Sequence, residues 1–254
     1  MPYRAIATSV EGFVQQIACC YLRHGYWLYV QGRIPAMKDP LAVDTKLIAK
    51  YGIGVSESTR ARRKQAGRAN LQYLRHDRTF VILATKGEHP FFQDEATAIR
   101  DLRHVPLKYE GYAISCRRGG RTRDGQPDGK LHAHVEIERR RYLAMKARFL
   151  ELATHRSADT LALAFYRFPF EPYAPVRRQM LNILRAVNEA RKPNGYRPVP
   201  TEVIPFRRRI VRPFEVMVQE LATVPSSTDL LLKQVETGSN LDHSVGTRSN
   251  PRND

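Results

Sequence analysis

The sequence predicts an α+β fold, with an antiparallel sheet of about five strands over residues 24–138 and helices packed on one face. A C-terminal helical segment and a disordered tail follow. Short runs rich in β-branched and aromatic residues fill the first half of the chain. Longer stretches with apolar residues at helical spacing come mainly after residue 138. The two kinds of segment alternate too irregularly for a doubly wound parallel sheet.

The N-terminal part begins with a helix and a strand. Apolar residues at helical spacing predict a helix over residues 8–24. The aromatic and β-branched run Tyr26–Ile34 predicts the first strand, which ends at a proline. Asp39 is an N-cap residue followed by Pro40 at the first helical position, so we expect a second helix that runs to Tyr51.

Further strands are predicted in the middle of the chain. Asn70–Arg75 and Thr79–Thr85 have the composition of two strands of a hairpin that turns at His76-Asp77. Glu95–Leu102 predicts a short helix, although its apolar spacing is poor. Leu107–Cys116 predicts another strand.

The most regular strand pattern covers residues 130–138, where apolar and polar side chains alternate without a break. A period of two places alternate side chains on opposite faces of a strand, with one face on the core. The apolar face carries Leu131, Ala133, Val135 and Ile137. The polar face carries Lys130, His132, His134, Glu136 and Glu138.

Three helices are predicted after this strand. The first covers Arg139–His155, with Leu143, Phe149, Leu150 and Ala153 directed inward. Ser157 is placed to cap a short helix that runs to Tyr166. Val176–Arg191 is a clear amphipathic helix with Val176, Met180, Ile183, Leu184 and Val187 on one face.

These elements suggest three regions along the chain. Residues 1–155 form an α+β core, and residues 156–215 form a helical extension with a basic patch. Residues 216–254 form a tail rich in Ser, Thr, Asn and Gly with no apolar period, which is typical of disorder.

Composition indicates the class of partner. The chain has 42 Lys and Arg against 25 Asp and Glu, a formal net charge of +17. Such an excess, gathered in clusters, indicates a polyanionic partner, and we expect DNA or RNA. No run approaches the roughly 20 apolar residues of a membrane span, and the N-terminus lacks a signal-peptide core. The three cysteines form no Cys-x-x-Cys zinc motif, so we expect inert or buried thiols in a reducing cytoplasm.

The cations gather in several places, and we predict that these contact phosphates. The candidate nucleic-acid-binding residues are Arg60, Arg62, Arg63, Lys64, Arg68, Arg117, Arg118, Arg121, Arg123, Arg140, Arg177, Arg178, Arg207, Arg208 and Arg209. The cluster within 56–68 is compatible with a solvated helix, but it favours a phosphate clamp, because five cations with few acids repel one another unless an anion binds. The glycine- and arginine-rich stretch 117–129 is a flexible clamp or a disordered hairpin tip.

The strand over residues 130–138 also carries a motif. His132-Ala133-His134 resembles the histidine–hydrophobic–histidine signature of the HUH endonucleases, the superfamily of rolling-circle replication initiators, relaxases and some transposases. Their core is an antiparallel sheet, and a helix-borne tyrosine attacks the DNA backbone. The resemblance implies that His132 and His134 bind Mg²⁺ or Mn²⁺ with Glu136 as a third ligand, and that Tyr142 is the nucleophile with Lys146 nearby.

Two departures from that family are visible. Alanine is smaller than its usual middle residue, and Tyr142 follows His134 by only eight positions. Tyr166 and Tyr173 are alternative nucleophiles, with no motif to choose between them. The sequence therefore predicts a basic protein that binds nucleic acid mainly through phosphates. The alternative is a metal-dependent single-strand DNA endonuclease of the HUH kind, and the histidine strand is also compatible with an ordinary solvated strand.

Overall fold

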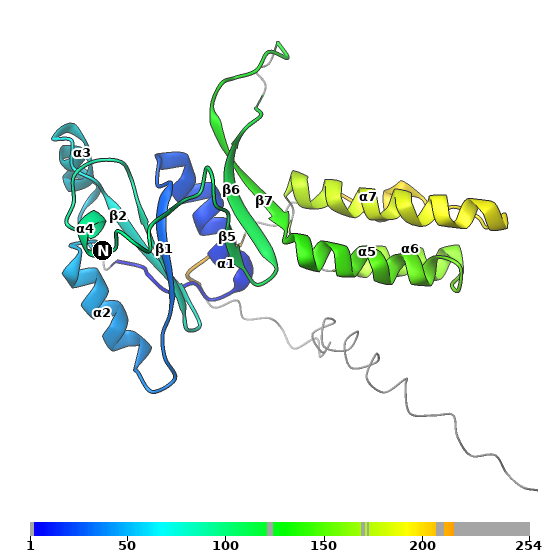
Figure 1. Ribbon diagram of the computed structural model, residues 1–254, viewed down its shortest axis with the longest axis horizontal. Coiled ribbons are helices and arrows are strands. Elements are labelled where there is room, and N and C mark those ends of the chain that lie inside the picture. Colours follow the sequence, from blue (N-terminus) through cyan, green and yellow to red (C-terminus); the bar gives the residue numbers. More distant parts are fainter. Residues whose placement is uncertain (1–2, 121–123, 169–170, 172, 207–210, 216–254) are drawn as a thin grey trace, which may run out of the picture. The chain divides into compact units, whose positions relative to one another are not determined.

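A computed structural model describes residues 3–120, 124–168, 171, 173–206 and 211–215 (Figure 1). All of them belong to one compact unit. The predicted α+β class is confirmed. In place of one sheet of about five strands, the described residues form a four-stranded and a three-stranded antiparallel sheet. The predicted tail over 216–254 lies outside the described residues.

The four-stranded sheet has the strand order β2-β3-β1-β4. Its strands are β1 (Leu28–Arg33), β2 (Leu71–His76), β3 (Thr79–Ala84) and β4 (Arg100–Asp101). The first strand and the β2–β3 hairpin confirm the predictions, although the hairpin turns one residue later than expected, at Asp77-Arg78. Asp77 has a φ of 51°, a left-handed conformation that Asp tolerates in tight turns.

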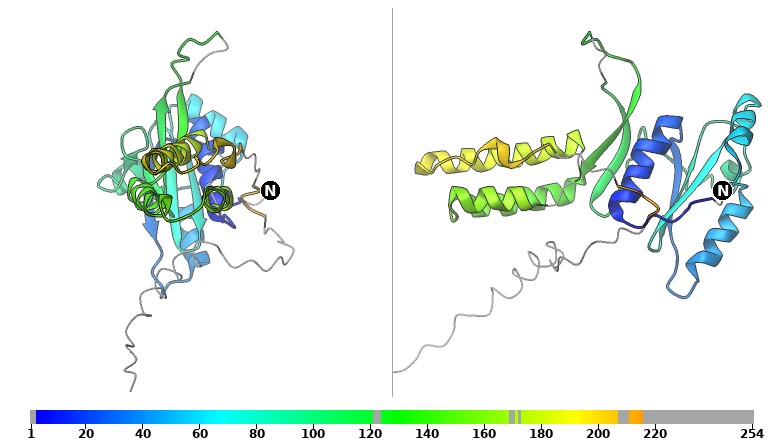
Figure 2. Two further views of the ribbon diagram at one scale, coloured as in Figure 1. Left: turned by 90° about the vertical axis from the view of Figure 1, so that its right-hand side faces the viewer. Right: turned by 180° about the vertical axis from the view of Figure 1, so that it is seen from behind.

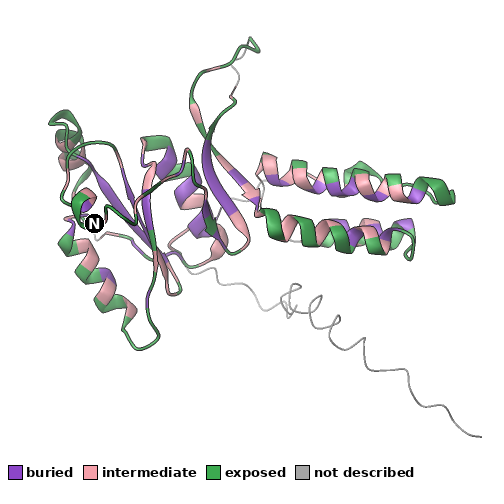
Figure 3. Cartoon of the chain, viewed as in Figure 1, coloured by how far each residue is buried: buried purple, intermediate pink, exposed green. Residues whose placement is uncertain are grey.

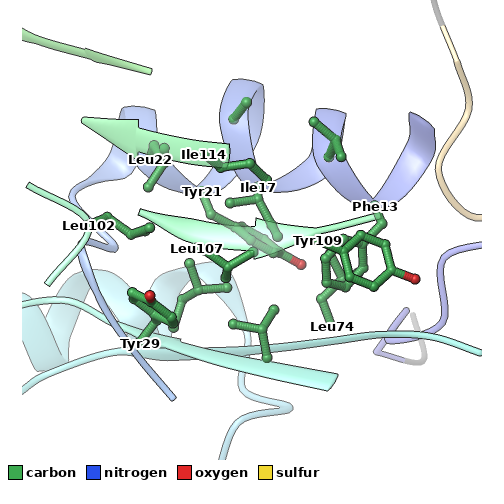
Figure 4. Packing of buried hydrophobic residues seen from close by; sticks show 14 of the residues in the cluster. Phe13, Ile17, Tyr21, Leu22, Tyr29, Leu74, Leu102, Leu107, Tyr109 and Ile114 are labelled. Carbon is green, nitrogen blue, oxygen red and sulfur yellow. The ribbon is translucent and has the colours of Figure 1, made fainter. Parts of the chain in front are cut away.

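One face of this sheet packs on the N-terminal helical run. This run consists of α1 (Val10–Gln15), the π-helix η1 (Gln16–Tyr21) and the 3₁₀ turn η2 (Leu22–His24), and it confirms the helix predicted over residues 8–24. The apolar cluster between helix and sheets is shown in Figure 4. Its members include Phe13, Ile17, Tyr21, Leu22, Tyr29, Leu74, Leu102, Leu107, Tyr109 and Ile114.

The opposite face packs on α2 (Pro40–Lys50) and α4 (Phe91–Asp94). Leu47, Ile48 and Phe91 from these elements join a second cluster with residues of β1, β2 and β3. Helices therefore cover both faces of the four-stranded sheet, and the prediction of helices on one face is corrected.

The helix predicted over Glu95–Leu102 is also wrong. α4 ends at Asp94, and the chain then forms the edge strand β4, in which Asp101 pairs with Leu28. Leu102 is fully buried, and its N–H donates to the carbonyl of Trp27. Pairing with β1 satisfies these main-chain groups, which outweighs the weak helical pattern.

The three-stranded sheet contains β5 (Leu107–Tyr109), β6 (Tyr112–Arg118) and β7 (Leu131–Ile137) in that order. The single strand predicted over Leu107–Cys116 is thus a hairpin. It turns at Glu110 and Gly111, whose φ angles are 44° and 79°. Two successive positive φ angles match the right-handed twist of the flanking strands, which is why such turns join short hairpins.

Three helices form the C-terminal part, as predicted: α5 (Arg139–Ala153), α6 (Ala158–Arg167) and α7 (Ala174–Arg191). Short 3₁₀ turns follow at Lys192–Asn194 and Thr201–Val203. α7 runs beside α5 and α6 (Figure 2). The inward faces meet in a third cluster, which includes all five predicted apolar residues of α7. Leu143, predicted to face inward, is 51% exposed, and Tyr142 and Met145 pack there instead.

Hydrogen bonds join α7 to the sheet and to α5. The Gln179 side chain accepts from the Ile137 N–H at 2.7 Å and donates to the Ile137 carbonyl at 3.0 Å, so it pairs with the edge of β7 as another strand would. Arg191 is buried and donates to the carbonyls of Ala153, Arg156 and Arg197. None of the helices within the described ranges combines the length and apolar character that a membrane span requires.

A buried ion pair connects α2 to β2. The Asp44 carboxylate accepts from Arg75 Nε at 2.8 and 2.9 Å and from the Tyr73 hydroxyl. Both charged side chains are less than 10% exposed. An unpaired charge in this position is strongly destabilising, so each partner requires the other.

We expect Asp44→Asn to lower the free energy of unfolding by about 3 kcal/mol or more, because it leaves the Arg75 charge buried without its counterion. Urea denaturation measures the change. Asp159→Asn is the matched control, since Asp159 pairs with Arg197 on the surface and is 80% exposed. That pair should contribute no more than about 1 kcal/mol. Equal losses in the two variants would contradict the assignment.

Candidate nucleic-acid interface

α3 (Glu57–Gln65) carries the first predicted cation cluster, and none of its residues is buried (Figure 3). The helix begins at Ser56, whose hydroxyl accepts from the Thr59 N–H at 3.2 Å. Glu57 lies in the first turn, and cations fill the last turn. Both placements suit the helix dipole. The solvated helix predicted as one alternative for this stretch is therefore present.

Polar contacts attach α3 to the rest of the protein. Arg60 Nη1 donates to the Val55 carbonyl at 2.7 Å, and Arg63 Nη1 donates to the Gly52 carbonyl at 3.1 Å. The Asn70 side chain donates to the Arg60 carbonyl at 2.9 Å. Because these bonds replace the apolar face that fixes most helices, Arg60 and Arg63 have a structural role besides any contact with a ligand.

Arg62, Lys64 and Arg68 are exposed on this helix and on the turn that follows it. None of the three forms an ion pair with a carboxylate in the described part of the chain. Their charges face solvent without a counterion among the described residues.

A hollow of about 340 Å³ opens beside α3. It is lined by Arg63, Arg68, Ala69, Glu88, His89 and Pro90. Main-chain hydrogen bonds build its rim, because the Glu88 N–H donates to the Gly67 carbonyl and the Ala69 N–H donates to the Glu88 carbonyl, both at 3.0 Å. Gly87 allows this contact, since its φ is 134° and a Cβ there would lie 2.6 Å from main-chain atoms of residues 67–69.

His89 forms a neutral wall of the hollow. Its Nδ1 accepts from the Phe91 N–H at 3.1 Å, which places the proton of the neutral ring on Nε2. Burial lowers the pKa of His89, and the nearby Arg63 charge lowers it further, while a hydrogen bond to the Tyr51 main chain acts in the opposite direction. Two arginines and one carboxylate thus carry the charge of the lining.

The polar face of β7 lies opposite polar residues of β6. His132 pairs in register with Arg117, and His134 pairs with Ser115. The Glu136 carboxylate accepts from Arg117 Nη2 at 3.1 Å, and its other oxygen lies 3.2 Å from His134 Nε2. The structure therefore brings Arg117, His134 and Glu136 together in one network.

His132 has a different partner. Its Nε2 lies 2.6 Å from Asp128 Oδ2, and Asp128 Oδ1 accepts from the Lys130 N–H at 2.9 Å. The pKa of Asp128 is lowered, mainly by the Lys130 hydrogen bond; burial acts in the opposite direction, and the contact with His132 lowers the pKa further. Gly120 lies against this pair, because a Cβ there would come within 2.2 Å of both partners. These contacts close the base of the loop between β6 and β7.

The predicted metal ligands do not form a fitting set. No three His, Cys, Asp or Glu residues gather to hold a metal ion within the part of the chain that the structure describes. His132 and His134 share the polar face of β7, but each contacts its own carboxylate. The binding of Mg²⁺ or Mn²⁺ by His132, His134 and Glu136 stays a prediction.

The candidate tyrosines lie on the helical part. Tyr142 packs against the third apolar cluster, and Lys146 is half-buried one turn further along α5. Tyr173 packs between two clusters, and burial raises its pKa. Tyr166 is 55% exposed. No hydrogen bond or ion pair found among the described residues joins Tyr142 to His132 or His134.

The other candidate cations are dispersed. Arg118 is exposed at the end of β6, and Arg140 and Arg178 are exposed in the first turns of α5 and α7. Arg177 donates to the Ile204 carbonyl and stacks on the Phe206 ring, 3.8 Å from its centre. Arg121, Arg123, Arg207, Arg208 and Arg209 lie outside the described residues.

Sequence reasoning missed Asp128 and the hollow beside α3. The Asp128-Gly129 pair is a turn signal, and it precedes His132 by four residues. The hollow joins residues 63–69 to residues 88–90, and no local pattern relates these stretches. All three cysteines are free; Cys116 is buried, whereas Cys19 and Cys20 are exposed.

No protein-family model matches the chain, and no curated protein matches it. The resemblance to the HUH endonucleases therefore stays a prediction from one motif.

We expect Asp128→Ala to free the Lys130 amide and the His132 ring, so that the Lys130 amide exchanges its hydrogen several-fold faster. Amide exchange followed by NMR measures this. In the wild type the lowered pKa of Asp128 means that the bond persists at neutral pH and is lost only as the pH falls through that folded-state pKa, below the ordinary carboxyl value of about 3.9. Asp124→Ala, an exposed acid in the same loop, is the control and should leave Lys130 unchanged.

Proposed function

We propose that this protein binds nucleic acid, DNA or RNA, mainly through backbone phosphates, and that α3 is the principal contact surface. The observation that carries the proposal is the exposed set Arg62, Lys64 and Arg68, which has no carboxylate partner among the described residues. Of the described candidate cations, only Arg117 forms an ion pair with a described carboxylate.

Charge repulsion within α3 supports this role. Arg60 and Lys64 are four residues apart on one helix, where like charges cost roughly 0.2–0.5 kcal/mol per pair. The helix dipole offsets part of this cost for the cations in the last turn. A phosphate polymer would remove the rest and release the counterions condensed on it, which is the main source of affinity in such complexes.

The polar face of the three-stranded sheet is a weaker candidate for the main contact. Arg117 is paired with Glu136, Lys108 with Glu138, and His132 with Asp128. Arg117 and Lys108 already have counterions, and Asp128 lies against His132, so a phosphate would have to displace a carboxylate. We assign this face, with the exposed Arg118, a secondary role.

Contacts with backbone phosphates position a protein on nucleic acid but do not distinguish one base from another. We therefore expect little preference for base sequence.

The first test is the salt dependence of binding. We expect the double substitution Arg62→Gln with Lys64→Gln to weaken binding of duplex DNA and to reduce the slope of log affinity against log salt by about 2, since each phosphate contact contributes about 0.9. Fluorescence anisotropy at several salt concentrations measures the slope, with single-stranded DNA and RNA of the same length in parallel.

The control removes the same charge elsewhere. Arg148 and Arg197 are exposed but paired with Glu151 and Asp159. Substituting both with Gln should leave the slope nearly unchanged. A wild-type slope near zero would refute the proposal, and equal effects of the two double variants would refute the assignment to α3.

The second test addresses the metal-dependent alternative. We expect no covalent adduct when the protein is incubated with labelled single-stranded DNA and Mn²⁺, because Tyr142 packs in the helical cluster and Glu136 is shared by Arg117 and His134. Denaturing electrophoresis detects an adduct. An adduct that disappears in His132→Ala and in Tyr142→Phe would overturn binding without cleavage. Tyr166→Phe and Tyr173→Phe would then show whether another tyrosine is attacked.

A further inference from the structure

The hollow beside α3 differs from the rest of the cationic surface because it is concave. Its volume of about 340 Å³ lies at the lower end of the range of small-ligand sites, which begins near 300 Å³. A backbone phosphate within a strand continues into a sugar on both sides, so it suits a convex surface. A concave site suits a phosphate at the end of a nucleic-acid strand.

The lining of the hollow contains more cations than carboxylates. Arg63 and Arg68 both line the hollow, and Glu88 is the one carboxylate of the lining. Glu88 forms no ion pair with either arginine or with any other described cation. Its carboxylate therefore does not take the place of an anionic ligand. Arginine presents paired donors that match the geometry of a phosphate group.

The position of the lining is fixed. Arg63 is held by its bond to the Gly52 carbonyl, and the rim is held by the main-chain bonds of Glu88 to Gly67 and Ala69. A seat formed in advance loses less entropy when a ligand binds. Arg68, in contrast, is exposed, and its side chain makes no hydrogen bond with the described residues, so it is available to the ligand.

We propose that this hollow binds the terminal phosphate of a nucleic-acid strand. The inference rests on the proposed function and narrows it to strand ends that carry a phosphate monoester. Such a group has three free oxygens and a charge near −2 at neutral pH, whereas an internal phosphodiester has two free oxygens and a single charge. Arg63 and Arg68 bind the monoester oxygens, and the exposed cations of α3 hold the phosphates that follow.

The test compares oligonucleotides of one sequence that carry a 5′-phosphate, a 3′-phosphate or hydroxyls at both ends. We expect the wild type to bind one phosphorylated form about tenfold more tightly than the hydroxyl form. Whichever form is preferred identifies the end that is recognised. Adenosine monophosphate, titrated alone and followed by the NMR signals of His89 and Arg68, serves as a probe of the hollow without a polymer.

Two single substitutions distinguish binding in the hollow from general electrostatic attraction to the cationic surface. Arg68→Gln removes a lining cation whose side chain forms no hydrogen bond or ion pair with the described residues. It should abolish the preference, and it should weaken binding of the hydroxyl form only by the loss of one cation, as Arg62→Gln does. Arg62→Gln removes one exposed charge that does not line the hollow, and it should weaken all three oligonucleotides by the same factor. Thermal unfolding should be unchanged in both variants.

The outcomes distinguish this inference from the proposed function. Equal binding of all three forms, with a steep salt dependence, would overturn the terminal-phosphate site and leave nucleic-acid binding intact. Equal loss of preference in the two variants would also overturn the site. Binding of adenosine monophosphate without binding of any oligonucleotide would overturn both, because the hollow would then be a site for a free phosphate ester.

Discussion

Burial of the four-stranded sheet on both faces is the constraint that determines where the surplus arginines lie. Side chains of β2 and β3 alternate between two apolar clusters, so neither strand has a solvent-facing row for charges. Arg75 is the exception, and it is tolerated because Asp44 neutralises it and the Tyr73 hydroxyl shares the carboxylate. Arg33, the last residue of β1, and Arg100, in the edge strand β4, are exposed, and the other described cations lie on elements outside this sheet. α3, the strand ends of the second sheet and the first turns of the long helices provide those positions.

α3 shows how such an element can be held without giving up its cations. Arg60, Arg63 and Asn70 attach it by hydrogen bonds to or from the main chain, and no residue of the helix is buried. Attachment by apolar packing would have required apolar residues on one face of the helix in place of cations. Polar attachment leaves Arg62 and Lys64 in solvent, and Arg63 lines the hollow. The same bonds that position the helix thus also arrange its charges.

Local patterns predicted most elements, and long-range pairing explains the failures. The helix capped by Asp39 and the strand over residues 130–138 follow from side-chain chemistry and period alone. Leu107–Cys116 contains one strand pattern, yet Glu110 and Gly111 turn the chain, because Gly is compatible with both sheet and turn. The segment Glu95–Leu102 ends in β4, whose two residues pair with β1, a partner about 70 residues away in sequence. The hollow was unpredictable for the same reason, whereas the grouping of His132, His134 and Glu136 on one face followed directly from alternation.

The contacts made by the polar face of β7 change where we expect nucleic acid to bind. The sequence favoured the polar face of this strand, because it carries two histidines beside an arginine-rich loop. In the folded chain, carboxylates of the protein itself already contact the basic side chains of that face. Glu136 contacts both Arg117 and His134, and Asp128 contacts His132. A phosphate that approaches this face meets carboxylates as well as basic side chains. Before such a side chain can bind the phosphate, it must release its carboxylate partner. On α3 no such exchange is needed, because Arg62 and Lys64 have no described counterion to give up. Electrostatic attraction therefore favours the helix over the sheet, although both surfaces carry arginine.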